Sequence, residues 1–496
     1  MREEGKCEFY NNTKKNGKNT DKANDMLKKL SFPAHTDKII EMCKNEKLCP
    51  YEVAMMLSQK AKVIVSDYYY VFSPGIRETF FLKTGKKIED SIIIVDEGHN
   101  LPTRVRDLLT HKLSNVMIVR SIKEAKKYGY TDLVEKLSIL LDIISRMSYD
   151  LDHRRKEKII LKDEIINKIK EHDDYDSFFS EMIMAGDDIR ASQKNSYVGS
   201  VGKFLEGWLG SDEGFARILS KPDENFISLS YRCLDPSLVT RDVFENAYSS
   251  IIMSGTLNPT YMYKDLLSFE KAVEKDFASP FPKKNKLALV VPKTTTKYSF
   301  RSEAQYKDIA RICADIVNAV PGNSAIFFPS YSLRNSVNRY FSNMSSKTTF
   351  LEDSRLNKKE KKDMLDSFKD YKKIGAVLLC AASGSFGEGI DLPGDLLKCV
   401  VVVGLPLMPP DLETKELIRY YDNKFGAGWD YGYVFPAFIK SLQNAGRCIR
   451  SEKDKGVMVF LDQRYAMQNY KRCFPKDLGV RVSTDHMKEI NEFFKQ

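Results

Sequence analysis

The sequence predicts an α/β protein of two to four domains, two of which are built on parallel sheets. The run Ile92–Val95 is apolar and β-branched without interruption, which is typical of a parallel strand buried on both faces. Between residues 283 and 496, short apolar runs alternate with amphipathic segments that have helical spacing. This alternation favours strands joined by right-handed helical crossovers, and therefore a parallel sheet.

The composition is that of an ordinary globular protein, with 42% hydrophobic and 29% charged residues. The formal net charge of +10 permits nucleic-acid binding without requiring it. The first six residues contain no secretory signal, and the apolar run Val400–Leu407 is too short to cross a bilayer. We therefore expect an intracellular protein with no membrane partner, nuclear only if its source is eukaryotic. Nine dispersed cysteines argue against a disulfide framework.

The first 50 residues are rich in lysine and asparagine and show little helical or strand periodicity. We expect a metal centre, rather than apolar burial, to hold this segment together. Its candidate ligands are Cys7, Cys43 and Cys49. A helix over Val53–Lys60 and a strand over Val63–Ser66 are predicted to follow.

Residues 116–215 predict an all-helical insertion. Leu133–Ile144 and Ile165–Ile169 carry apolar residues at helical spacing, interrupted by the basic run Arg154–Lys156. An ordinary helical subdomain with no role in DNA handling is the alternative.

The second domain is predicted to contain five buried strands. They are Leu287–Val291, Ser324–Phe328, Ala376–Leu379, Val400–Val403 and Val457–Leu461. Helices are expected over Tyr306–Val317 and Lys358–Phe368.

Two acids, Asp96 and Glu97, follow the strand Ile92–Val95, in the crevice where an open α/β sheet binds its ligand. In a nucleotide hydrolase the first acid can hold Mg²⁺ through coordinated water, and the second can polarise the attacking water. The alternative is a strand that simply ends in a polar loop. Arg447 and Arg450, three residues apart, are expected on one face of a helix, where guanidinium groups suit phosphate oxygens. A solvated surface pair is the alternative for these arginines.

Four short motifs follow one another along the chain: DEGH (96–99), SGTL (254–257), GSFGEGID (384–391) and QNAGRCIR (443–450). Their order resembles that of motifs II, III, V and VI in superfamily 2 helicases. The flanking words LDPS (234–237) and SPFP (279–282) resemble the XPD family of iron–sulfur DNA helicases specifically. The resemblance covers nearly the whole chain outside the insertion, and the bacterial DinG helicases are the closest alternative.

The resemblance implies two RecA-like motor domains, the first incomplete, with a partial iron–sulfur segment and a helical arch. The implied divisions are 1–55 for the iron–sulfur segment, 56–115 and 216–282 for motor domain 1, 116–215 for the arch and 283–496 for motor domain 2. It further implies an ATP-dependent helicase that moves 5′-to-3′ on single-stranded or forked DNA in repair. ATP, Mg²⁺ and a [4Fe–4S] cluster are the implied cofactors. We expect a monomer with possible partners in a repair complex.

The resemblance also implies roles for individual residues. The catalytic set comprises Asp96, Glu97, His99, Arg447 and Arg450. Nucleotide contacts are expected from Glu388, Gly389, Asp391, Gln443 and Gly446, and coupling between domains from Ser254, Gly255 and Thr256. Ser330, Tyr331 and Tyr69 are the candidates for DNA contact, with core packing as the alternative for the aromatic residues.

The chain departs from the family pattern in two ways. The sequence contains no Gly-x4-Gly-Lys-Ser/Thr, the loop that cradles nucleotide phosphates. Cys7 and Cys49 resemble the third and fourth ligands of the family cluster, whereas Cys43 matches no ligand position. We therefore expect either an N-terminally truncated helicase or a natural variant that does not bind ATP in the usual way. A DNA-binding or regulatory protein without catalysis is the alternative function; a redox protein has no use for the hydrolytic residues.

Overall fold

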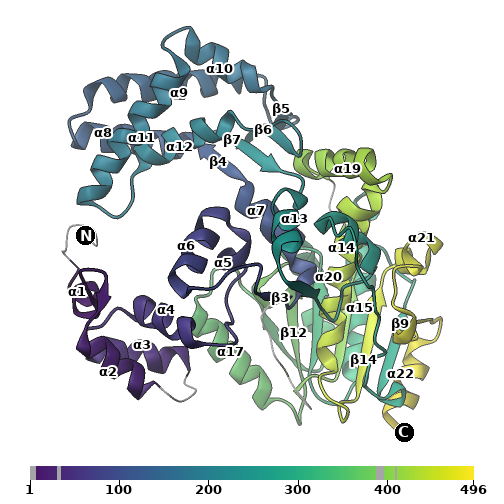
Figure 1. The fold of residues 1–496 in the computed structure, drawn as a ribbon. Helices are drawn as coiled ribbons and strands as arrows, with labels where there is room; N and C mark the ends of the chain where they lie inside the picture. The colour runs from purple at the N-terminus through teal and green to yellow at the C-terminus, as the bar shows by residue number, and fades with distance from the viewer. Residues whose placement is uncertain (1–6, 31–34, 387–391, 393–395, 408–409, 496) are drawn as a thin grey trace. The chain divides into compact units, whose positions relative to one another are not determined.

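The computed structural model describes the chain in two compact units. The first comprises Met1–Ser254 and Tyr263–Lys271, and the second comprises Gly255–Met262 and Ala272–Gln496. The description covers every residue outside 1–6, 31–34, 387–391, 393–395, 408–409 and 496. Figure 1 shows the course of the chain.

The second unit contains a seven-stranded sheet whose neighbouring strands are all parallel, in the order β11-β12-β10-β13-β14-β9-β15. Its strands are β9 (Lys286–Val290), β10 (Ser324–Phe328), β11 (Thr348–Leu351), β12 (Ala376–Ala381), β13 (Cys399–Val403), β14 (Gly456–Leu461) and β15 (Arg481–Val482). All five predicted strands are confirmed. The two that were not predicted, β11 and β15, are the edge strands, which carry exposed residues and lack a continuous apolar run.

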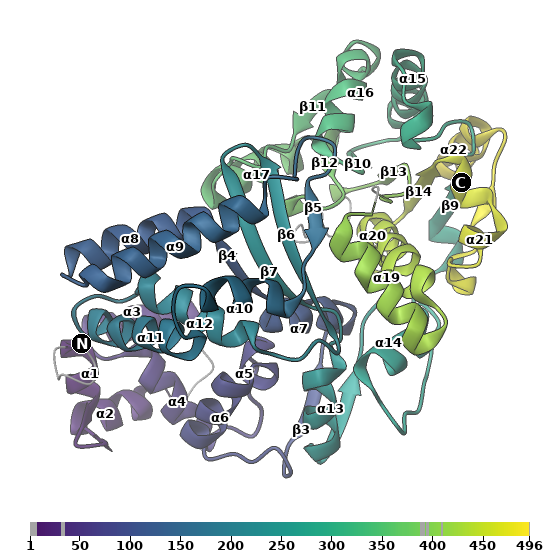
Figure 2. The ribbon, with the colours of Figure 1, turned by 90° about the horizontal axis from the view of Figure 1, so that it is seen from above.

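Helices cover both faces of this sheet, as Figure 2 shows for α15 and α16 on one side and α20 on the other. The helices are α15 (Glu303–Ala319), α16 (Tyr331–Met344), α17 (Lys358–Asp370), α19 (Leu412–Phe425), α20 (Phe435–Ala445), α21 (Gln468–Lys471) and α22 (His486–Lys495). Strand residues such as Leu289 and Val401 pack into one core with α15, α16 and α22. On the opposite face, Phe460 contacts Tyr465, which in turn contacts Phe438 of α20. Burial on both faces explains why the strands are continuously apolar.

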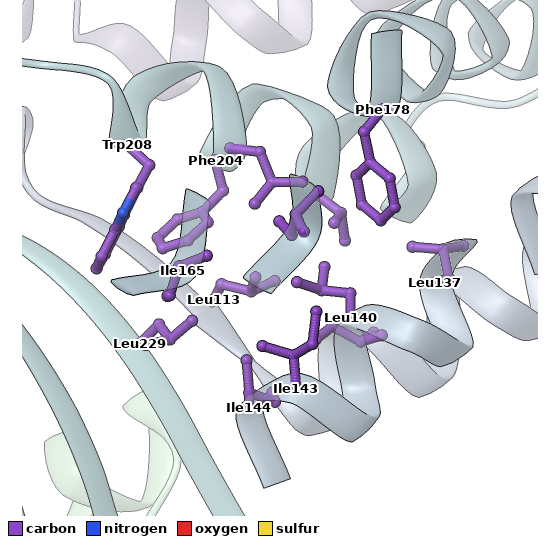
Figure 3. Close-up of a cluster of buried hydrophobic side chains, with 14 of the residues drawn as sticks. Leu113, Leu137, Leu140, Ile143, Ile144, Ile165, Phe178, Phe204, Trp208 and Leu229 are labelled. Carbon is purple, nitrogen blue, oxygen red and sulfur yellow. The ribbon is translucent and has the colours of Figure 1, made fainter. Parts of the chain in front are cut away.

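In the first unit, five helices pack with a four-stranded antiparallel sheet of order β4-β7-β6-β5. The helices are α8 (Asn115–Lys127), α9 (Thr131–Met147), α10 (Lys162–Lys170), α11 (Tyr175–Ser192) and α12 (Tyr197–Trp208). The strands are β4 (His111–Ser114), β5 (Glu157–Ile159), β6 (Phe215–Asp223) and β7 (Phe226–Cys233). Figure 3 shows side chains from α9, α10, α11, α12, β4 and β7 in one apolar cluster, with Leu140, Phe178 and Trp208 fully buried.

The insertion predicted as all-helical differs from the structure in one element. Strand β5 lies within residues 116–215 and pairs with β6. Its sequence, Glu-Lys-Ile, is too short and too polar to show strand periodicity, so only the pairing with β6 defines it.

The first 50 residues also differ from expectation, because they are largely helical and have an apolar core of their own. The helices are α1 (Glu8–Thr13), α2 (Asp21–Lys29), α3 (Thr36–Asn45) and α4 (Pro50–Lys60), with a short hairpin of β1 (Lys14–Lys15) and β2 (Lys18–Asn19). Met26, Cys43, Leu48 and Val53 are buried together. Apolar burial therefore contributes to holding this segment, contrary to the prediction that a metal centre alone would do so.

The remaining elements of the first unit include a two-stranded parallel sheet of β3 (Ile92–Val95) and β8 (Ser249–Ile252). The helices are α5 (Tyr69–Phe72), α6 (Pro74–Thr84), α7 (Leu101–Leu109) and α13 (Ser237–Asn246), and α14 (Thr260–Leu267) follows β8. The parallel pairing is as predicted, but burial on both faces is not, because Ile92 and Ile94 are each 58% exposed. The strand predicted over Val63–Ser66 is wrong: no strand is assigned there, and Val65 is 94% exposed. A β-branched run forms a strand only where a neighbouring strand pairs with it, and none of the described strands does so.

Candidate functional site

The two predicted acids lie in a tight turn at the carboxyl end of β3. The Asp96 carboxylate accepts a hydrogen bond from the Glu97 backbone N–H at 2.9 Å. Glu97 has a left-handed backbone, with φ 48° and ψ 40°. Gly98 then donates its N–H to the Met253 carbonyl at 2.9 Å, and a Cβ at Gly98 would collide with the side chain of Ile252. Glycine is therefore needed where the turn approaches β8.

Glu97, His99 and Ser254 form a hydrogen-bonded cluster beside this turn. His99 Nδ1 lies 2.6 Å from Ser254 Oγ and 3.3 Å from Glu97 Oε2. The Ser254 hydroxyl donates to Glu97 Oε2 at 3.2 Å. The imidazole is largely buried and the carboxylate is largely exposed, so one end of the cluster is fixed and the other faces solvent. The structure thus brings together residues that are more than 150 positions apart in the chain.

Tyr68, which was not predicted to contribute to the site, contacts the turn that contains the two acids. Its hydroxyl donates to the carbonyl of Asp96 at 2.6 Å and lies 3.1 Å from that of Glu97. Partial burial, followed by the nearby charges of Glu97 and Asp96, raises the pKa of Tyr68. The neighbouring Tyr69, which was predicted to contact DNA, is half exposed. The run of three tyrosines at residues 68–70 was the signal in the sequence, and nothing there distinguished its members.

The three residues predicted to couple the domains span the boundary between the units. Ser254 belongs to the first unit, where it bonds Glu97 and His99. Gly255 and Thr256 belong to the second unit. There the Gln443 amide of α20 donates to Thr256 Oγ1 at 3.4 Å. The hydroxyls of Ser254 and Thr256, two residues apart, therefore form hydrogen bonds in different units.

The expectation that Arg447 and Arg450 share a helix face is wrong. Helix α20 ends at Ala445, and Gly446 begins the 3-10 turn η6 (Gly446–Cys448), which includes Arg447. The Arg450 backbone N–H donates to Asp454 Oδ2 at 2.6 Å, so this segment follows a loop instead of continuing the helix. Arg447 is buried and Arg450 is exposed.

Two residues predicted to contact DNA have structural contacts in the second unit. The Ser330 hydroxyl caps α16 by accepting a hydrogen bond from the Leu333 N–H at 3.3 Å. The Arg334 guanidinium lies over the Tyr331 ring, 5.0 Å from its centroid. Burial, followed by the Glu352 charge, raises the pKa of Tyr331 to about 12. The candidate nucleotide ligands Glu388, Gly389 and Asp391 lie outside the described residues.

The candidate cluster ligands do not form a complete site. Cys7 and Cys49 precede the first turns of α1 and α4, and Cys43 is buried in α3. Burial, and then the neighbouring Cys49, raises the pKa of the Cys43 thiol. Among the described residues, no group of three or more His, Cys, Asp or Glu side chains is arranged to hold a metal ion. A [4Fe–4S] cluster normally takes four thiolates, so these residues do not fit one.

Within the described parts of the chain, every helix is too short or too polar to cross a membrane.

Two family models match the sequence. A Helicase C-terminal domain model matches residues 313–480, and the DEAD_2 model matches residues 1–118. The general transcription and DNA repair factor IIH helicase subunit XPD/RAD3 of Saccharomyces cerevisiae is 22% identical over 90% of this chain and 68% of its own length. The ATP-dependent DNA helicase XPD of Sulfolobus acidocaldarius is 26% identical over 86% of this chain and 74% of its own.

Solved structures share the fold. One titled XPD helicase aligns with a TM-score of 0.62 at 23% identity, covering 90% of this chain and 77% of its own. A structure titled XPD apo aligns with a TM-score of 0.58 at 22% identity, covering 84% and 81% respectively.

Proposed function

The chain belongs to the XPD family of superfamily 2 DNA helicases, and from this premise we propose that it uses ATP to translocate 5′-to-3′ on single-stranded DNA during repair. Its substrate would be single-stranded or forked DNA, and its partners those of a repair complex. The observation that carries the proposal is the cluster of Glu97, His99 and Ser254. A carboxylate that is bonded to a histidine and a serine, next to a second acid, is suited to phosphoryl transfer.

Each acid of the turn has a distinct proposed role. Asp96 and Glu97 are both exposed at the end of a parallel strand, where their oxygens fit a hydrated Mg²⁺ and a nucleotide. Bound Mg²⁺ would neutralise charge on the phosphates. Glu97 would orient and polarise the attacking water, and His99 would relay the position of Glu97 to Ser254.

The second unit would supply positive charge. Arg447 is a buried guanidinium directly after α20, and Arg450 is exposed three residues later. We assign these side chains to phosphate oxygens, since planar guanidinium groups bind phosphates bidentately. Gln443 and Gly446 would position the turn that carries Arg447. The hydrogen bond from Gln443 to Thr256 would link nucleotide binding to the coupling residues Ser254, Gly255 and Thr256.

A catalytically inactive DNA-binding relative is the second candidate. The observation that favours it is the absence of Gly-x4-Gly-Lys-Ser/Thr from the 496 residues. The retained acids and arginines favour the helicase, because a scaffold does not require them. We therefore expect slow ATP turnover from this polypeptide by itself, and rapid turnover would contradict the importance that we give to the loop.

The two candidates separate on the variant Glu97→Gln, which keeps the shape of the side chain and removes its charge. If the helicase proposal holds, DNA-stimulated ATP turnover should fall by about 100-fold or more, while affinity for single-stranded DNA stays unchanged. Glu89→Gln, an exposed carboxylate near the other end of β3, is the matched control and should leave both quantities unchanged. DNA binding without any turnover by the unmodified chain would favour the inactive relative.

A further inference from the structure

A fully buried carboxylate in the second unit has no role in the chemistry described above. Glu352 follows the edge strand β11, and its backbone N–H donates to the Leu379 carbonyl of β12 at 3.0 Å. The residue has zero solvent exposure. A buried carboxylate is costly unless several donors satisfy its oxygens, so its partners indicate why it is there.

Three donors to this carboxylate come from one short segment, Ala381–Phe386, and the Tyr331 hydroxyl of α16 also bonds to it. The backbone N–H of Ala381 donates to Oε2 at 2.9 Å. The Ser385 hydroxyl and the Phe386 backbone N–H each donate to Oε1 at 3.0 Å. Both ends of the segment are therefore bonded to the same side chain.

The middle of the segment is fitted to the same carboxylate. A Cβ built on Gly384 would collide with the carboxylate oxygens of Glu352. The backbone of Gly384 does not have positive φ, so the close approach, and not the backbone conformation, requires glycine here. The Ala382 N–H donates to the Phe328 carbonyl of β10 at 2.7 Å, which ties the segment to the sheet.

Glu352 is itself held in place. The buried Arg334 guanidinium of α16 donates to the Glu352 carbonyl oxygen and to the Asn335 side chain. The segment Ala381–Phe386 lies at the carboxyl end of β12, where an open parallel sheet presents its ligand-binding loops. The chain then continues directly into Gly387 and the residues expected to contact nucleotide.

We propose that Glu352 is a positioning residue whose carboxylate sets the conformation of Ala381–Phe386, the turn that precedes in sequence the residues expected to contact nucleotide. The carboxylate accepts charge-assisted hydrogen bonds from two backbone N–H groups and one hydroxyl of this turn, and this fixes the turn before ligand binds. The link to nucleotide rests on the proposed function, whereas the effect on the turn does not.

The test compares the full chain with its variant Glu352→Gln. Glutamine has nearly the same volume, but its NH₂ group replaces one of the two acceptor oxygens and cannot accept a hydrogen bond from the N–H and O–H donors of the turn. Hydrogen exchange of the Ala381 and Phe386 amides should become about tenfold faster, because each loses a charged acceptor. Exchange in β10 and β13 should be unchanged. Glu303→Gln, an exposed carboxylate of α15 in the same unit, should leave all of these rates unchanged.

Gly384→Ala provides an independent variant, because it pushes the segment off the carboxylate without altering Glu352. It should accelerate exchange at the same amides. Unchanged exchange in both variants would overturn the proposal. Equal acceleration throughout the sheet would also overturn it, because Glu352 would then only stabilise the fold.

A kinetic measurement separates positioning from the proposed function. In Glu352→Gln, the KM for ATP in DNA-stimulated turnover should rise at least fivefold, with a smaller change in kcat. Faster exchange with an unchanged KM would overturn the link to nucleotide. Absence of turnover in the unmodified chain would count against the helicase proposal alone, since hydrogen exchange still decides whether Glu352 positions the turn.

Discussion

Replacing Glu97 by glycine is expected to relieve backbone strain in the first unit while it removes activity. Glu97 has a left-handed backbone, which costs an L-residue other than glycine about 1 kcal/mol. Glycine adopts this conformation without that cost. The substitution also removes the bond from Ser254, so Glu97→Gln serves as the reference that lacks the charge but keeps the strain. We expect Glu97→Gly to be more stable than Glu97→Gln by about 1 kcal/mol, or roughly 2–4 °C in Tm.

The measurement is urea unfolding of the first unit followed by the fluorescence of Trp208. This residue is fully buried in the first unit, and the other tryptophan, Trp429, lies in the second. A Trp429→Phe background therefore isolates the signal. Glu89→Gly is the control, because Glu89 is exposed and outside the left-handed region, so glycine should not stabilise the unit there. If Glu97→Gly is no more stable than Glu97→Gln, the strain at this turn has been misassigned.

Three further predictions concern stability. Asp462 is fully buried, and both of its carboxylate oxygens accept hydrogen bonds from the Arg464 guanidinium. Asp462→Asn should therefore lower the free energy of unfolding of the second unit in urea by about 3–5 kcal/mol, and a loss below about 1 kcal/mol would contradict this. Burial holds the pKa of His486 below its ordinary value, so the contribution of the neutral imidazole to stability is complete above about pH 6.5 and is lost as the pH falls through the folded pKa. His486→Phe should therefore weaken the dependence of the urea unfolding midpoint on acid pH, and an unchanged dependence would refute this. Leu140→Ala should lower the free energy of unfolding of the first unit by about 2–5 kcal/mol, because it opens a cavity in the cluster of Figure 3. Leu161→Ala, at a 69% exposed position, is the control and should change the unfolding free energy measured by Trp208 fluorescence by less than about 0.5 kcal/mol.

The structure confirms the buried strands of the second unit and the position of Asp96 and Glu97 at the end of β3, whereas the catalytic role of these acids stays a prediction. β10 and β13 were predictable because helices cover both faces of the sheet, and this coverage requires an uninterrupted apolar run. The structure also explains why Glu97 and Ser254 lie close together. Both follow parallel strands, and strands that pair in register, Val95 with Ile252, deliver their carboxyl ends to the same edge.

The failures occur where backbone pairing and polar contacts, which apolar periodicity does not report, decide the conformation. The run Val63–Ser66 has strand propensity, yet no described strand pairs with it, so propensity alone did not decide its conformation. The segment after Ala445 has helical spacing, but it continues as a 3-10 turn, and the backbone N–H groups of Arg450 and Ser451 then donate to the Asp454 side chain in a loop. The tyrosine run that contains Tyr68 did not indicate these contacts, because the partners of Tyr68 are carbonyl groups, which every residue carries.

The sequence alone determined the α/β class, the order of the motifs and the residues at the ends of the strands, because these depend on local apolar periodicity and on position along the chain. The tertiary structure decided which polar side chains meet: His99 with Ser254, and Glu352 with the turn that begins at Ala381. Such pairs are selected by the geometry of the folded sheet and by the need to satisfy buried polar groups. The spacing of residues along the chain predicts neither the geometry of the folded sheet nor which buried polar groups need a partner.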